Sequence, residues 1–272
     1  MLPSDTLVHV DTLVLKLVLA PLLIAAASFA GRRWGQAVSG WFVGLPLTSG
    51  PIALILALEY GPAFAAAAAL GSLLGAVAEA GFSLAYAGAA LRWRWPVATA
   101  AACTAFVVIG AGLQQVPLGL VPLTVVVFAA LAVALRLMPP TSRVVMVPAP
   151  PRWDVPARMV IATILVLLLT EAAPALGPRL AGVLATFPVY AAIMTVFAHR
   201  AAAAPAIQVL RGLLLGLFAF AAFFVVLGVT IERAGVVTAF AAALIAALLV
   251  QTLSLGVVLF AGPRERQPPG AR

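Results

Sequence analysis

Charged residues are scarce in this 272-residue chain, since only 9% of it is Asp, Glu, Lys or Arg, whereas 64% is apolar. One soluble core cannot bury that much apolar surface. The apolar residues also recur in runs of about 20 residues or more, the length that crosses about 30 Å of hydrocarbon. The composition therefore predicts a polytopic membrane protein whose solvent is the lipid bilayer.

Residues that build nucleophile and metal sites are equally few. Cys103 is the single cysteine, so the chain can form no intrachain disulfide and no Cys-based metal site. The two histidines, His9 and His199, lie far apart and lack carboxylates at ligand spacing. HExxH, GxSxG, P-loop, GxGxxG and CxxC motifs are all absent. We therefore expect no catalytic residue, no metal and no cofactor, and we do not expect an enzyme.

A net charge of +8 raises the question of nucleic acid, but the arginines stand at the ends of apolar runs, where they set topology. We expect no nucleic-acid partner. Proline, glycine and arginine divide the sequence into nine expected all-α spans, with approximate limits of 12–30, 37–58, 62–91, 96–114, 118–138, 157–174, 180–198, 205–231 and 235–260.

Lysine and arginine favour the cytoplasmic ends of spans. With the N-terminus outside and the C-terminus inside, only Lys16, Arg179 and Arg233 of the 16 basic residues fall on the outer side. Four tryptophans then lie at the inner interface beside arginines, namely Trp34, Trp93, Trp95 and Trp153. We expect this orientation in a bacterial inner membrane.

The two halves of the chain match at fixed offsets. A shift of 142 positions brings Gly35, Gly40 and Pro46 onto Gly177, Gly182 and Pro188, and brings Lys16 onto Arg158; a shift of 141 brings Gly71 and Gly75 onto Gly212 and Gly216. Matches at glycine and proline indicate similar backbone geometry. Because five spans precede the proline-rich joint, the second copy has the opposite orientation, which is an arrangement found in many secondary transporters.

The expected organisation follows from this repeat. Residues 1–138 hold the first repeat, spans 1–4, and the adapter span 5. Residues 139–156 form a proline-rich cytoplasmic linker, residues 157–262 hold the inverted second repeat, spans 6–9, and residues 263–272 form a cytoplasmic tail.

The second copy resembles the GlpM family of small bacterial inner-membrane proteins. The resemblance covers roughly residues 175–235 and lies in Leu180-Ala181-Gly182, Phe187-Pro188, Arg200, Leu210-Arg211 and Gly216. It implies an inner-membrane location and little chemistry, and it makes the chain a fused pair of such units. The first half departs from the pattern, because Gly44 to Pro51 replaces the Phe-Pro segment and the paired arginines are absent.

Two spans contain breaks at matching positions. Pro46 removes a backbone donor within the second span, and Pro188 occupies the equivalent position in the seventh. Interrupted spans at corresponding positions indicate a transported substrate, although prolines can also kink helices for packing alone. The expected substrate-binding residues are Pro46, Thr48, Ser49, Thr186, Pro188 and Tyr190.

Glu79 is the ionisable residue deepest within a span, where a charge is costly unless it is paired or hydrated. It shares a helix face with Gly71 and Gly75, and we expect it to couple transport to an ion. The alternative is a structural ion pair with Lys16 or Arg211. Arg200 and Arg211 are expected as contacts for an anion, unless they serve topology alone.

The sequence thus favours a secondary transporter, or a translocase for a lipid or small molecule. The alternative is a non-transporting scaffold or an assembly factor for envelope biosynthesis. The expected partners are the lipid bilayer and a lipid or small-molecule substrate, and the sequence leaves a homodimer open.

Overall fold

The fold is entirely helical in the part of the chain that the computed structural model describes, which is residue 18 and residues 21–47, 49–141, 153–172 and 187–260. Residues 21–34 are helical. Nine further helices have defined bounds within those ranges: α2 (Gln36–Val43), α3 (Ser49–Tyr60), α4 (Pro62–Ala90), α5 (Trp95–Leu113), α6 (Leu120–Leu137), α7 (Asp154–Ala172), α9 (Val189–His199), α10 (Ala203–Ala234) and α11 (Val236–Phe260).

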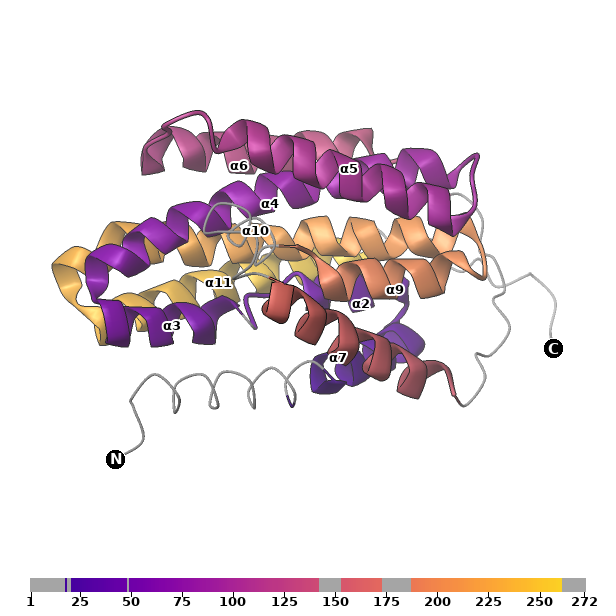
Figure 1. The fold of residues 1–272 in the computed structure, drawn as a ribbon, viewed down its shortest axis with the longest axis horizontal. Helices are drawn as coiled ribbons and strands as arrows, with labels where there is room; N and C mark the ends of the chain where they lie inside the picture. Colours follow the sequence, from indigo (N-terminus) through magenta and orange to yellow (C-terminus); the bar gives the residue numbers. More distant parts are fainter. Residues whose placement is uncertain (1–17, 19–20, 48, 142–152, 173–186, 261–272) are drawn as a thin grey trace.

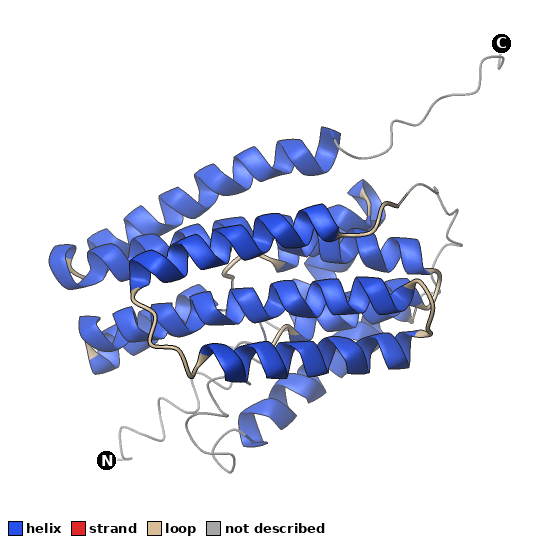
Figure 2. Cartoon of the chain, turned by 90° about the horizontal axis from the view of Figure 1, so that it is seen from above, coloured by secondary structure: helices blue, strands red, loops and turns tan. Residues whose placement is uncertain are grey.

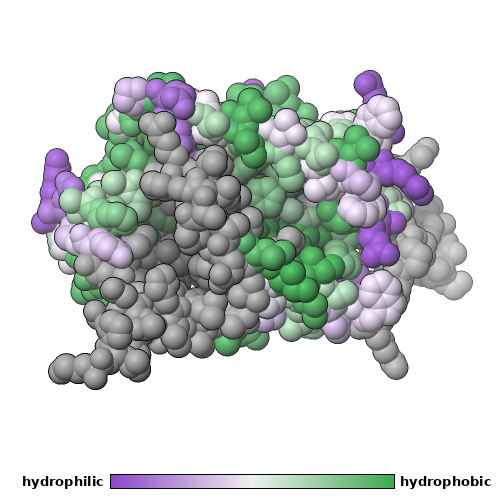
Figure 3. All heavy atoms as spheres, in the orientation of Figure 1, coloured by the Kyte–Doolittle hydropathy of each residue, from purple (hydrophilic) through white to green (hydrophobic). Residues whose placement is uncertain are grey.

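Five helices are long and apolar enough to cross a membrane: α4, α5, α6, α10 and residues 236–256 of α11. They run side by side along the long axis of the molecule (Figure 1). In the space-filling view, a hydrophobic middle separates two ends where hydrophilic residues gather (Figure 3). These features are those of a multi-pass membrane protein, and they confirm the predicted all-α polytopic fold class.

Glycine turns set where several helices end. Gly35, Gly61 and Gly235 have positive φ angles of 97°, 87° and 78°, a conformation that costs glycine little because it has no Cβ. Gly35 stops the first helix after Trp34, four residues later than the sequence predicted. Pro62 then begins α4 at a position where its missing N–H costs nothing.

The turns gather at two ends. The turns at Gly61 and Gly235 and the α5–α6 connection lie at one end of the helices, and the α4–α5 and α9–α10 turns lie at the other (Figure 1). The second end carries Arg92, Arg94 and Arg200 and is called here the arginine-rich end. Four exposed tryptophans accompany these and other arginines in the sequence, namely Trp34, Trp93, Trp95 and Trp153.

Helix α10 is the centre of the bundle. It packs against α2, α4, α6, α9 and α11, and α4 packs in turn against α3, α5 and α6. Figure 2 shows the long helices stacked with nearly parallel axes.

Five predicted spans agree with helices of the structure to within about three residues at each described end. They are 62–91 with α4, 96–114 with α5, 118–138 with α6, 205–231 with α10 and 235–260 with α11. Helix α4 continues without interruption through Gly81.

Candidate functional site

The predicted break in the second span is present. Helix α2 ends at Val43 and α3 begins at Ser49, so this span is two helices joined by a non-helical segment. Buried Pro46 has no N–H to donate, and the backbone turns tightly around it, with Leu47 N donating to Leu45 O at 2.8 Å and Gly50 N to Pro46 O at 2.9 Å. Thr48 lies outside the described residues.

The seventh span has a comparable irregular position. Phe187 and Pro188 are non-helical and α9 begins at Val189, although Thr186 and the residues before it lie outside the described part. Pro188 is buried, and its carbonyl oxygen accepts a hydrogen bond from Ala192 N at 2.8 Å. Phe187 fixes this start to the first half, because its ring packs edge-on against Phe82 and Phe106 at 6.2 and 5.4 Å between centroids.

A small cavity lies between these two positions. Leu45 and Leu47, which flank Pro46, line it together with Tyr190 near the start of α9; Leu23, Phe42 and Val43 complete the wall. Its volume is about 20 Å³, which is room for a single water molecule. The structure thus brings the irregular segments of spans 2 and 7 to one place, where Tyr190 is the one lining residue whose side chain carries a polar group.

Glu79 lies elsewhere. It is half-buried on α4 and is not among the residues that line this cavity. Its backbone carbonyl accepts the Ser83 hydroxyl at 2.8 Å. Among the described residues no basic side chain forms an ion pair with its carboxylate, and Arg211 bonds to other groups. Its expected coupling role stays a prediction.

The two arginines expected to contact an anion have protein partners. Arg211 Nη2 donates to the carbonyls of Met138 and Pro139 at 3.3 and 3.0 Å, where α6 ends. A guanidinium at that position satisfies orphan carbonyls and complements the negative end of the helix dipole. Arg200 lies over the rings of Trp153 and Phe197, with its Cζ at 5.9 and 5.7 Å from their centroids. Arg211 Nε has no hydrogen-bond partner among the described residues, and the anion contacts expected of both arginines stay a prediction.

Glycines join α2 to α10 at backbone distance. A Cβ at Gly40 would lie 1.7 Å from Val209 O, and one at Gly212 would lie 1.8 Å from Ala37 O. Gly44 and Gly216 face each other in the same way, because a Cβ on either would lie 2.8 Å from the Cα of the other. Gly212 and Gly216 therefore form a packing face, and its partners are Gly40 on α2 and Gly44 directly after α2.

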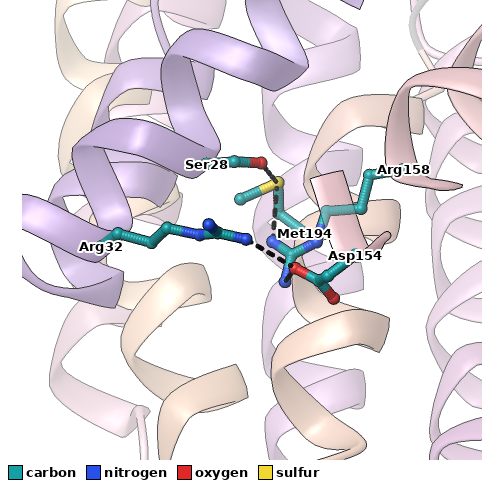
Figure 4. Close-up of polar contacts among 5 residues, drawn as sticks. All are labelled: Ser28, Arg32, Asp154, Arg158 and Met194. Atoms are coloured by element: carbon teal, nitrogen blue, oxygen red, sulfur yellow. Dashed lines mark hydrogen bonds and ion pairs between the residues drawn. The ribbon is translucent and has the colours of Figure 1, made fainter. Parts of the chain in front are cut away.

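Sequence reasoning missed a buried polar cluster. Asp154 Oδ2 lies 2.8 Å from Arg158 Nη2 and 3.5 Å from Arg32 Nη2. Met194 Sδ accepts from Arg158 Nη1 at 3.5 Å and from the Ser28 hydroxyl at 3.7 Å (Figure 4). We call these five residues the Asp154 cluster. The charge bias of the sequence predicts only a topological role for Arg32 and Arg158, whereas the i, i+4 pair of Asp154 and Arg158 at the start of an apolar span was the available signal.

The chain resembles nothing strongly enough to identify it: no family model matches it, and neither a curated protein nor a solved structure does. Its function must therefore be argued from its own residues.

Proposed function

We propose that this protein is a secondary transporter, or a translocase for a lipid or small molecule, and not an enzyme. Its substrate site lies between the break at residues 44–47 and the start of α9. The observation that carries the proposal is the cavity that Leu45, Leu47 and Tyr190 line from both irregular spans. Non-helical backbone is tolerated at membrane depth where protein or a wet cavity satisfies it, and such interruptions mark substrate sites in transporters.

The contacts between helices support an inverted repeat that frames this site. Helices α4 and α5 pack together as α10 and α11 do, and α3 packs on α4 as α9 packs on α10. Helix α3 touches α11 as α9 touches α5, and the adapter α6 contacts both α4 and α10. A two-fold axis near the α4–α10 contact would relate each of these pairs. Rocking of two such units about a central site is the usual route to alternating access.

The proposed orientation places the arginine-rich end in the cytoplasm. The described residues at that end include Arg92, Arg94 and Arg200, whereas the end with the Gly61 and Gly235 turns carries Arg233. The excess of arginine and the tryptophans beside it follow the positive-inside rule and the interfacial preference of tryptophan. A bacterial inner membrane and a relationship to the GlpM family belong to the same proposal.

A scaffold or an assembly factor for envelope biosynthesis is the second candidate. The small volume of the cavity favours it, because a space for one water molecule admits no larger substrate in this conformation. The two functions differ in what the cavity must do. A transporter must open it alternately to both sides of the membrane, and a scaffold has no need to open it at all.

Access to the cavity from each side tests the proposal. Leu45→Cys in a Cys103→Ala background places one thiol in the cavity wall, and a membrane-impermeant maleimide is added to sealed vesicles of each orientation. Cysteines at exposed Arg92 and Arg233 report which end each preparation presents. We expect position 45 to react from both sides, faster from one of them. A thiol that reacts from neither side, in protein whose two end markers react normally, contradicts the transporter and leaves the scaffold.

The coupling role of Glu79 is tested separately by flux. Proteoliposomes are prepared with NBD-labelled phosphatidylglycerol, and dithionite bleaching reports lipid transfer under an imposed proton gradient. If Glu79 carries the coupling proton, Glu79→Gln abolishes the effect of the gradient on the rate, because the amide cannot exchange a proton. Glu232→Gln is the matched control, since Glu232 is exposed near the Gly235 turn, at the end away from the arginine-rich end. An unchanged gradient effect in Glu79→Gln removes the coupling assignment, and bleaching no faster than in protein-free vesicles removes the lipid substrate.

A further inference from the structure

The Asp154 cluster lies between the cavity and the arginine-rich end. Leu23 lines the cavity, and Ser28 and Arg32 follow it on the same helix, about 8 and 14 Å further along at 1.5 Å per residue. Tyr190 lines the cavity from α9, and Met194 follows it by about 6 Å. In both helices this direction leads to the arginine-rich end, where Trp34 and Arg200 end the two segments.

The Asp154 cluster joins the first half of the chain to the second. Arg32 and Ser28 belong to the first half, whereas Asp154, Arg158 and Met194 belong to the second, and their side chains point toward one another (Figure 4). Asp154 Oδ2 is the anion that both ion pairs share, because guanidinium nitrogens from both halves lie within 3.5 Å of it. The side chains of Asp154 and Arg158 are each only 10% exposed, and that of Arg32 is 43% exposed. Arg32 is therefore the member of the two ion pairs that is most exposed.

We propose that the Asp154 cluster is a gate that closes the arginine-rich end of the route to the cavity, a role that rests on the proposed function. The same helices line the cavity and carry the gate, so separating Arg32 from Asp154 would open the cavity toward that end. The one-water volume of the cavity is the expected state behind a closed gate.

The chemistry of the cluster suits a contact that must break. Arg158 is buried and lies over the Phe197 ring, with its Cζ at 4.8 Å from the centroid. Its polar partners are one carboxylate oxygen and a thioether, which is a weak acceptor, and its Nε has no hydrogen-bond partner among the described residues. The desolvation of a buried ion pair offsets much of its Coulomb attraction, and opening returns water to these groups. The closed and open arrangements therefore differ by a small free energy, as a gate requires.

The gate is tested by the rate at which the cysteine at position 45 reacts from the arginine-rich end. Asp154→Asn keeps the shape of the side chain and removes the charge that both guanidiniums share. We expect labelling from that end to accelerate about tenfold or more, which corresponds to a shift of about 1.4 kcal/mol in the equilibrium between closed and open forms. Labelling from the opposite end should not accelerate, because opening at one end closes the other in alternating access.

Two controls isolate the charge. Asp154→Glu retains the carboxylate and should stay closer to the parent rate than Asp154→Asn. Arg33→Ala removes the neighbouring exposed arginine, which forms no ion pair among the described residues, and should leave the rate unchanged. If Asp154→Asn does not fold, Arg32→Gln opens the same contact from its half-exposed side and carries the test.

The outcomes separate the gate from the function. If position 45 reacts from the opposite end but neither Asp154→Asn nor Arg32→Gln changes its rate from the arginine-rich end, the gate is wrong and the transporter remains. If acceleration occurs equally from both ends, the cluster is a general structural contact and the gate is wrong. If position 45 reacts from neither end in any variant, the proposed function fails and the gate fails with it.

Discussion

Two of the contacts that join the first half of the chain to the second differ in kind. Between α2 and α10 the glycines at 40, 44, 212 and 216 bring backbone against backbone with no room for a Cβ. In the Asp154 cluster, long charged side chains span the distance between the helix 21–34 and α7. The glycine contact depends on shape alone, whereas the Asp154 cluster depends on charges that water can also satisfy.

The difference indicates which contact is permanent. Within a bilayer the apolar effect does not drive helices together, so close packing of small residues supplies the attraction, and it is lost when the helices part. Charged groups behave differently because hydration replaces much of what they lose on separation. We therefore expect the α2–α10 contact to persist through any conformational change and the Asp154 cluster to be the contact that opens.

The largest expected effect comes from breaking the glycine contact. Gly212→Leu forces a side chain into the carbonyl of Ala37, so α2 and α10 must separate, and we expect loss of monodisperse protein in size-exclusion chromatography. Gly88→Leu is the matched control, because Gly88 lies on the long helix α4, where a Cβ would meet no atom within 4 Å, and this position should accept leucine. Equal behaviour of the two variants would contradict a permanent α2–α10 contact.

The next effect distinguishes the two partners of the charged contact. Asp154→Ala leaves Arg158 buried without its carboxylate, and we expect a loss of about 3–5 kcal/mol in unfolding free energy. The double variant Asp154→Ala with Arg158→Met removes the uncompensated charge and should recover much of that loss. Unfolding by denaturant in detergent measures both. A double variant as unstable as the sum of its single changes would show that the pair contributes through packing and not through charge.

The smallest effect concerns a polar contact that belongs to neither the α2–α10 glycine contact nor the Asp154 cluster. Arg211→Met removes two charged hydrogen bonds to the carbonyls at the end of α6, and we expect a loss of about 1.5–3 kcal/mol. Arg136→Met is the control, since Arg136 lies in the last turn of α6 and forms no ion pair among the described residues. Labelling of position 45 should stay unchanged in both variants. Faster labelling in Arg211→Met would extend the opening contact beyond the Asp154 cluster.

Part of the site could be predicted because its signals are local. Pro46 interrupts a helix that would otherwise run through it, since the missing donor and the ring clash act on the turn that precedes the proline. The gap between α2 and α3 followed from that alone. The role of Arg211 could not be predicted, because its partners at Met138 and Pro139 are about 70 residues away, and nothing near Arg211 in the sequence indicates them. The surroundings of Glu79 could not be predicted either, since the depth of a residue within a span does not indicate which cavity its side chain faces.

The sequence alone determined that this chain lies in lipid and where its long helices run. Every backbone group in hydrocarbon must bond within its own segment, so length and hydropathy suffice to define a span. Only the tertiary structure decided which faces of those spans meet, that Gly40 and Gly44 are the partners of Gly212 and Gly216, and that Arg32 reaches Asp154. The physical reason is that lipid tails and neighbouring helices are equally apolar, so the sequence of an apolar helix face does not indicate whether lipid or another helix will contact it.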